Sequence, residues 1–239
     1  MFEDAIVYPW RGEQNVKTVA IGGVLGILAI FVFPALFANG YLVRVMRQVG
    51  VGDTETPPVF DDWGGLLVDG LVSLLIAFVY LFVTMTLISA SIVLFSSFAG
   101  AGGGGNAGGG IALLGFVVGL VLVLVSVIVG LAAFYLLPGA VAAYAVTGDL
   151  GSAFSPSTLW TVGGDKSYLV GVLIAVLINV TAQIAGSMIY LTIIGILFIP
   201  FIFFYGNVAS AYAIGAGVAE TALVDDSPDT ESPADQPAV

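Results

Sequence analysis

The polar side chains that could do chemistry within the apolar part of this chain gather in one segment. Asn179, Gln183, Ser187 and Tyr190 follow one another at spacings of four, four and three, which places them near one face of a helix of about 3.6 residues per turn. An unpaired amide costs several kcal/mol in hydrocarbon, so these groups must face other helices or a wet cavity. The stripe is therefore either a packed contact between helices, which we favour, or a hydrophilic path through the bundle.

A second group of polar residues surrounds a predicted loop. If helices extend over 41–48 and 62–69, Arg44 and Arg47 share one helix face and Asp62 and Asp69 share another, so the four side chains could pair across the loop. One hypothesis is a gate, or a site for an anionic headgroup or solute beside the two arginines. We favour a clasp that fixes the helix ends, in which each exposed pair contributes about 0 to 1 kcal/mol.

Residue types that support catalysis are scarce. The chain has no cysteine and no histidine, which excludes thiol nucleophiles, histidine acid–base catalysis and the usual zinc ligands. Asp165 follows Gly163 and Gly164 outside the predicted spans, without a second acidic residue in the membrane. No charged residue lies near the middle of a predicted span, which disfavours proton-coupled transport. We predict a non-enzymatic protein without catalytic residues, metal site or cofactor.

The elements that carry these residues must be membrane helices. Hydrophobic residues make up 59% of the 239 residues and charged residues 9%, against about 45 to 50% and about 25% in soluble domains. The apolar blocks exceed the roughly 18 residues that identify a spanning helix, and they lack the alternation of barrel strands. We predict an all-α integral membrane bundle of about five transmembrane helices with short interfacial helices, surrounded by the lipid bilayer.

The expected organisation has three parts: an interfacial amino-terminal segment over 1–17, a transmembrane domain over 18–219 and a disordered acidic tail over 220–239. The predicted helices cover 18–39, 66–95, 111–137, 168–190 and 195–218. The third should stop at Pro138, with short interfacial turns over 140–165. The glycine-rich loop at 99–110 has the composition of a flexible linker and lacks the Lys-Ser/Thr of a phosphate-binding loop.

Small residues and polar exits give two further expectations. Gly22 with Gly26, and Gly115 with Gly119, are spaced for close helix approach. The first, third and fifth predicted helices each end in an aromatic-polar stretch, which allows a parallel two-helix repeat with these exits on one face.

Orientation follows from the five basic residues. Arg44, Arg47 and Lys166 fall on the exit face, whereas Arg11 and Lys17 fall on the other. Positive residues concentrate on the cytoplasmic side of membrane proteins. We therefore expect a multi-pass protein of the cell membrane with its exit face and acidic tail in the cytoplasm and its amino terminus outside.

Net charge limits the partners. Sixteen acidic residues against five basic ones give a formal charge of −11 and a pI near 4.1, so nucleic acid is not expected as a partner. An acidic exterior on an apolar body is also typical of a salt-adapted organism, because salt screens the repulsion between carboxylates.

Three stretches resemble a known family: GYLVRVMR at Gly40–Arg47, PPVFDDWGGLLVDGL at Pro57–Leu71 and AFSPSTLW at Ala153–Trp160. They are similar to an archaeal and bacterial family of multi-pass membrane proteins classed as a domain of unknown function, of the type found in halophilic archaea. The similarity extends over most of Met1–Ala219, whereas the glycine-rich linker and the acidic tail look peculiar to this chain. The resemblance implies a membrane fold and location. It implies no activity and transfers no functional residue.

Two classes of function remain. The first is a non-enzymatic membrane module that assembles with itself or with other membrane proteins through small-residue faces. The second is a permease or channel for a small or lipid-like solute that uses the stripe from Asn179 to Tyr190. They differ in whether that stripe is wet. We prefer the first, because ionisable groups are missing from the spans.

Overall fold

The computed structural model describes residues 1–101, 108–189, 193–221 and 223. Within these residues all regular structure is helical, which confirms the predicted fold class. In chain order the elements are α1 (Phe2–Val7), η1 (Tyr8–Trp10), α2 (Asn15–Ile27), η2 (Leu28–Ile30), α3 (Val32–Gly50), α4 (Trp63–Ala101), α5 (Gly108–Thr147), η3 (Leu150–Phe154), α6 (Pro156–Gly163), α7 (Lys166–Ile189) and α8 (Ile193–Ala219).

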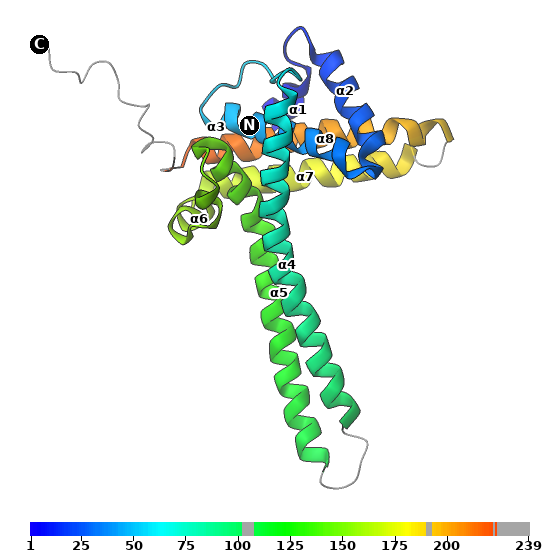
Figure 1. Cartoon of the computed structure of the whole chain (residues 1–239), viewed down its shortest axis with the longest axis vertical. Helices are drawn as coiled ribbons and strands as arrows, with labels where there is room; N and C mark the ends of the chain where they lie inside the picture. The colour runs from blue at the N-terminus through cyan, green and yellow to red at the C-terminus, as the bar shows by residue number, and fades with distance from the viewer. Residues whose placement is uncertain (102–107, 190–192, 222, 224–239) are drawn as a thin grey trace, which may run out of the picture. The chain divides into compact units, whose positions relative to one another are not determined.

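The chain forms two compact units. One unit combines Met1–Leu75 with Pro138–Val239, and the other is Ile76–Leu137. The second unit is a hairpin in which the distal half of α4 runs beside the proximal half of α5 (Figure 1). Ser91 and Ser126 join the two helices through a hydrogen bond of 2.7 Å between their hydroxyl groups.

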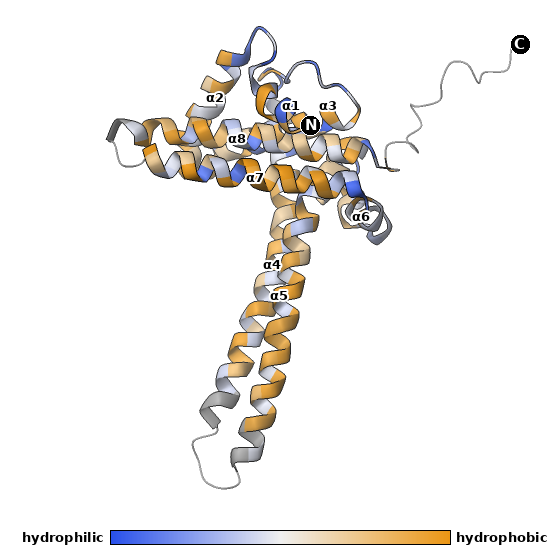
Figure 2. Ribbon diagram, turned by 180° about the vertical axis from the view of Figure 1, so that it is seen from behind, coloured by the Kyte–Doolittle hydropathy of each residue, from blue (hydrophilic) through white to orange (hydrophobic). Residues whose placement is uncertain are grey.

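The helices have the length and composition of membrane spans. Four candidate spans are present in the described residues: Trp63–Ser97, Leu113–Thr147, Lys166–Ile189 and Gly195–Ala219. The hairpin of the second unit is predominantly apolar along its length on the side seen in Figure 2. Its large side chains, including Phe78, Phe82, Leu124 and Ile128, are exposed. A helix that is hydrophobic on all sides belongs in a lipid environment, so the protein is embedded in a membrane.

The first expected span, 18–39, has a different form. It is divided among α2, η2 and α3, and Phe31 between them has an extended backbone with φ −92° and ψ 119°. The shorter apolar helical segment Asn15–Ile30 covers only about 24 Å at the helical rise, less than the hydrocarbon core of about 30 Å. The described part of the chain thus has four long apolar helices and this shorter segment.

The chain reverses direction at this break. Along α2 the contacts with α8 move from Phe204, opposite Gly22, to Pro200, opposite Gly26. Along α3 they move the other way, from Phe204 beside Tyr41 to Gly215 beside Val49. The turn exposes a run of large apolar side chains, of which Ile30 is 86% and Phe31 65% accessible. Such a tip is unfavourable in water, which favours its burial in hydrocarbon.

Three other boundaries differ from the expectations. The helix α5 continues through Pro138 to Thr147, because the alanines at 140, 142, 143 and 145 are strong helix formers that are also buried. The loop between α4 and α5 is shorter than the predicted 99–110, because α4 extends to Ala101 and α5 starts at Gly108. In place of the expected interfacial turns the structure has η3 and α6. The side chain of Trp160 on α6 is 83% exposed. The acidic tail lies almost entirely outside the described residues.

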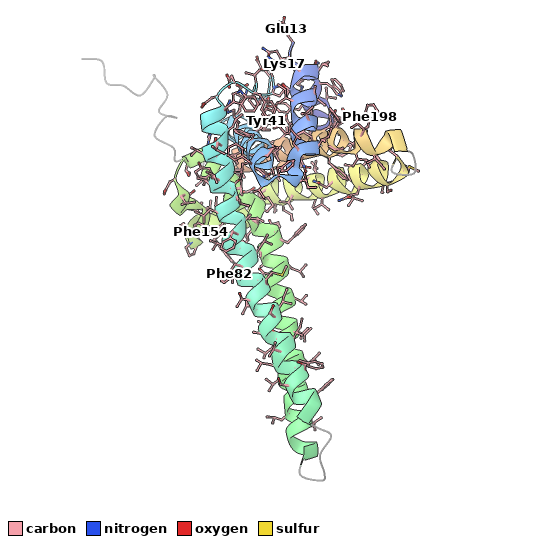
Figure 3. All side chains as sticks on the ribbon, turned by 45° about the vertical axis from the view of Figure 1, so that its right-hand side comes forward. Glu13, Lys17, Tyr41, Phe82, Phe154 and Phe198 are labelled. Carbon is pink, nitrogen blue, oxygen red and sulfur yellow. The ribbon has the colours of Figure 1, made fainter. Side chains whose placement is uncertain are left out.

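The helix α8 is central to the first unit, where it contacts α1, α2, α3 and α7. Tyr41 lies fully buried inside this unit, whereas Glu13 and Lys17 extend from its periphery at the start of α2 (Figure 3). Backbones approach closely where α3 crosses α4: a Cβ on Gly40 would overlap the carbonyl oxygen of Leu66, and a Cβ on Gly70 that of Leu36. This crossing places Arg47 near Asp69.

Candidate functional site

The arginine and aspartate residues around the loop form two ion-pair clusters. In the first, both terminal nitrogens of Arg47 donate to the carboxylate of Asp69 at 2.8 Å. The hydroxyl group of Tyr144 donates to the same carboxylate at 3.0 Å, and Nε of Arg47 donates to the carbonyl oxygen of Ala145 at 2.9 Å. The cluster therefore ties α3 to the start of α4 and the end of α5.

Burial and bidentate geometry make this cluster the stronger of the two. Asp69 is buried and Arg47 is half-buried. Hydrogen bonding to Asp69 is the main cause of a raised pKa of Arg47, so the guanidinium stays charged at any physiological pH. Planar, paired contacts of this kind are among the stronger ionic hydrogen bonds in proteins.

The second cluster surrounds Arg44. Its guanidinium donates to Asp61 at 2.6 Å and lies 3.6 Å from the carboxylate of Asp62. The pKa of Asp61 lies below its usual value because the backbone N–H of Asp62 donates to its carboxylate and because Arg44 is adjacent. Asp62 precedes α4 and accepts from the backbone N–H of Gly65 at 3.0 Å. It thus caps the helix instead of sharing a helical face with Asp69.

This geometry disfavours the predicted anionic site beside Arg44 and Arg47. Each guanidinium already contacts at least one carboxylate, so an incoming phosphate or carboxylate would have to displace a protein group. The arrangement is that of a clasp between helix ends. Asp61, Tyr144 and the carbonyl group of Ala145 were not among the expected members, although Asp61 stands next to Asp62 in the sequence.

The polar stripe on α7 does not share one environment. Nδ2 of Asn179 donates to the hydroxyl oxygen of Ser210 on α8 at 2.7 Å and to the carbonyl oxygen of Ala175 at 3.0 Å. Ser187 is exposed and donates to the carbonyl oxygen of Ile184. Gln183 is exposed, and its side chain has no hydrogen-bond partner among the described residues. Tyr190 lies outside the described residues.

Asn207 on α8 is exposed beside Gln183. The two helices run antiparallel, as the pairing of Asn179 with Ser210 and of Ala182 with Gly206 shows. Gln183 and Asn207 each follow one residue after the Ala182–Gly206 contact. One residue turns a helix by about 100°, and in an antiparallel pair these two turns lead to the same flank. Figure 2 shows hydrophilic positions along both helices.

The opposite flank of the α7/α8 pair is covered by α1. Phe2 and Ile6 of α1 enclose an apolar cavity of about 220 Å³ against side chains of α7 and α8 that include Ile178 and Tyr205. The hydroxyl group of Tyr205 donates to the carbonyl oxygen of Ile6. The flank that carries Gln183 and Asn207 is therefore the exposed one.

The small-residue faces expected to serve assembly are occupied within the chain. Phe204 packs on Gly22, Pro200 lies against Gly26 and Phe95 lies against Gly119. Gly115 is buried as well. These glycines shape contacts between helices of one molecule, which corrects the expectation that they form a free docking surface.

The expected separation of basic residues also requires correction. Arg11 donates to the carbonyl oxygen of Thr54 at 2.9 Å, in the loop between α3 and α4. Arg11, Asn15 and Thr18 line a polar pocket of about 150 Å³ together with residues of that loop, among them Thr56. The start of α2 and this loop therefore lie on one side of the first unit, because the chain reverses at Phe31.

Known protein families include a match to this chain. A family model described as "Protein of unknown function (DUF4013)" matches residues 24–191, which include all three stretches that carry the resemblance. No curated protein and no solved structure matches the chain.

Proposed function

Because the chain belongs to the DUF4013 family of proteins of unknown function, we propose its role from its geometry: it is a non-enzymatic membrane protein whose α7/α8 pair assembles with further transmembrane helices. The observation that carries this proposal is the exposed flank with Gln183 and Asn207. Exposed amides within membrane helices need partners, since an unsatisfied polar group costs several kcal/mol in hydrocarbon. A neighbouring helix supplies such partners.

The position of Gln183 along α7 supports this proposal. It lies four residues, or about 6 Å, beyond Asn179 and six residues, or about 9 Å, before Ile189, the last residue of the helix. A long side chain near a helix end can reach the interface, but the short side chain of Asn207 in the middle of the span Gly195–Ala219 cannot. In the candidate span Gly195–Ala219, Asn207 thus faces hydrocarbon wherever no further helix covers it.

A non-enzymatic role is supported by the residue types. The chain contains neither cysteine nor histidine. Within the described residues, no group of three or more acidic side chains is placed to hold a metal ion. The strongest polar cluster, around Asp69, is fully paired and ties helices together.

A permease or channel for a small or lipid-like solute is the alternative, and it requires that this flank be wet. The position of Asn179 disfavours it, because its amide is engaged between α7 and α8 while Gln183 and Ser187 face outward. Asn179, Gln183 and Ser187 thus do not follow one another along a single lining.

Spin labels can distinguish these environments. Val176 lies seven residues, two turns, before Gln183 on the same face of α7, and Leu177 is an exposed residue on another face. We propose to attach a nitroxide to Val176→Cys and, as the matched control, to Leu177→Cys in lipid vesicles. Relaxation by oxygen reports lipid, and relaxation by a water-soluble nickel complex reports water.

Assembly predicts that the label at 176 is shielded from both relaxation agents, whereas the label at 177 responds to oxygen. A response to the nickel complex at 176 would favour the permease or channel. Strong oxygen relaxation at both positions would contradict assembly as well, because it would mean that the flank faces lipid.

The reversal at Phe31 supports a proposed orientation in the membrane. With Arg11 and Lys17 on the side of Arg44, Arg47 and Lys166, all five basic residues of the chain lie on one side. The preference of basic residues for the cytoplasm then places this side, with the acidic tail, in the cytoplasm of a cell whose plasma membrane holds the protein. The amino terminus shares that side. The acidic excess supports a salt-adapted host.

A further inference from the structure

We infer that the partner of the exposed α7/α8 flank is a second copy of this chain, with Gln183 of each copy hydrogen-bonded to Asn207 of the other around a two-fold axis along the membrane normal. This inference rests on the proposed assembly function and names its partner.

The two side chains are complementary to each other. A carboxamide presents an acceptor oxygen and two N–H donors, so one amide can give and receive a hydrogen bond with another. Neither Gln183 nor Asn207 uses this capacity on a described residue. The hydroxyl groups nearby differ, because Ser187 and Thr181 donate to backbone carbonyl oxygens of their own helix.

Similar depth makes the pairing reciprocal. Gln183 and Asn207 each follow directly after the contact between Ala182 and Gly206, and because the helices are antiparallel the two positions lie about 3 Å apart in depth, at a rise of about 1.5 Å per residue. Two copies inserted in the same direction are related by an axis along the membrane normal, and rotation about this axis preserves depth. Gln183 of one copy therefore lies within about 3 Å of the depth of Asn207 of the other, a difference that the long glutamine side chain can span.

Symmetry also sets the direction of the helices. When the exposed flanks of two α7/α8 pairs face each other across a two-fold axis, α7 of one copy lies opposite α8 of the other. The contact is isologous, so each dimer contains the Gln183–Asn207 pair twice. A partner of different sequence would need its own polar residue at this depth. A second copy has the matching amide because Gln183 and Asn207 belong to the same chain.

The pairing predicts a specific cross-link. The chain has no native cysteine, so two differently tagged chains, one Gln183→Cys and the other Asn207→Cys, can be co-expressed and treated in membranes with a short, membrane-permeant bifunctional thiol reagent. We expect an adduct that contains both tags. The control pair Leu177→Cys with Asn207→Cys should give little, because Leu177 lies on a different face of α7.

Dilution in lipid vesicles measures the strength of the contact. Energy transfer between labelled full-length chains should show a dimer, and the double variant Gln183→Leu with Asn207→Leu should raise its dissociation constant about tenfold or more, as two lost interhelical bonds imply. Thr181→Val is the control, since its hydroxyl group is satisfied within α7, and it should leave the constant unchanged. The circular dichroism of all variants should match that of the unmodified chain.

The outcomes separate this inference from the proposed function. A monomer with a spin label at 176 that is still shielded would overturn self-association and retain assembly with another protein. A dimer that is insensitive to the two leucines would overturn the amide pairing. The absence of any adduct, together with strong oxygen relaxation of the label at 176, would show that the flank faces lipid, which contradicts both.

Discussion

At the scale of single residues, the pair of Arg47 and Asp69 should contribute most to stability among the ion pairs. We expect Asp69→Ala to lower the free energy of unfolding by about 2 kcal/mol, because it leaves the half-buried guanidinium of Arg47 without its carboxylate. Breaking a fully buried pair costs about 3 to 5 kcal/mol, and the partial exposure of Arg47 to solvent reduces this loss. Thermal unfolding in detergent followed by circular dichroism measures the effect.

The matched control for this substitution is Asp62→Ala. The carboxylate of Asp62 is 67% exposed and lies 3.6 Å from Arg44, so we expect a loss of about 1 kcal/mol or less, including its capping bond. Equal losses for the two variants would contradict a dominant role for the Arg47–Asp69 pair.

Acid should release Arg44 from Asp61. The pKa of Asp61 is lowered by the N–H of Asp62 and by Arg44. The ion pair is therefore intact above the ordinary aspartate pKa of about 3.9, and it is lost only as the pH falls through the lower pKa of Asp61 in the folded state. Carbon chemical shifts of the Asp61 carboxyl group should therefore titrate below the ordinary midpoint. Arg44→Gln should raise that midpoint partway, and an unchanged midpoint would contradict the contribution of Arg44.

Only part of the cluster around Arg47 and Asp69 could be predicted from the sequence. Arg47 and Asp69 were expected near each other because both flank one short loop. Tyr144 could not be foreseen as a partner, since 75 residues separate it from Asp69 and no local pattern encodes such a contact. The environment of Gln183 was equally hidden, because periodicity identifies a face of a helix without showing what covers it.

At the scale of helices, the crossing of α3 and α4 depends on residues without side chains. A Cβ on Gly70 would overlap the backbone of Leu36, so Gly70→Ala must push the helices apart. We expect a loss of about 1 to 3 kcal/mol in the free energy of unfolding, the usual cost of overpacking. Chemical denaturation in micelles is a suitable measurement.

Gly64→Ala on the same helix is the control. Its nearest neighbour is the carboxylate of Asp62 at 3.6 Å from the added Cβ, an ordinary contact, and alanine favours the helical backbone. This variant should be neutral or slightly more stable, by up to about 1 kcal/mol. If Gly70→Ala behaved the same way, the close approach would not be needed.

Helix identity followed from composition, but two boundaries did not. Apolar blocks predicted the spans later found as α4, α5, α7 and α8, because hydrophobicity alone identifies such segments. The division of 18–39 at Phe31 comes just before Pro34, which stands in the first turn of α3 and has no N–H to continue the hydrogen bonds of the preceding helix. A proline predicts such a break, but the reversal of direction depends on contacts with α8 that the local sequence does not show. The continuation of α5 beyond Pro138 likewise reflects burial of the alanines that follow.

At the scale of the whole molecule, the reversal at Phe31 changes which segments share a side of the membrane. We expect Gln14→Cys and Glu55→Cys to react with an impermeant thiol reagent from the same, cytoplasmic side, in inside-out vesicles but not in intact cells. A continuous span over 18–39 would instead place Gln14 opposite Glu55, and this result would contradict the reversal.

The central position of α8 has a consequence for biosynthesis. The carbonyl oxygen of Ile6 accepts from Tyr205, 199 residues later, and α2 packs on Phe204 and Pro200. At about 5 to 20 residues per second, a ribosome needs about 10 to 40 seconds to make that stretch of chain. The amino-terminal helices leave the ribosome first but acquire their packing partner last. During this interval their apolar tip has no protein to cover it, so the nascent chain depends on lipid or a chaperone to protect it from aggregation and proteolysis.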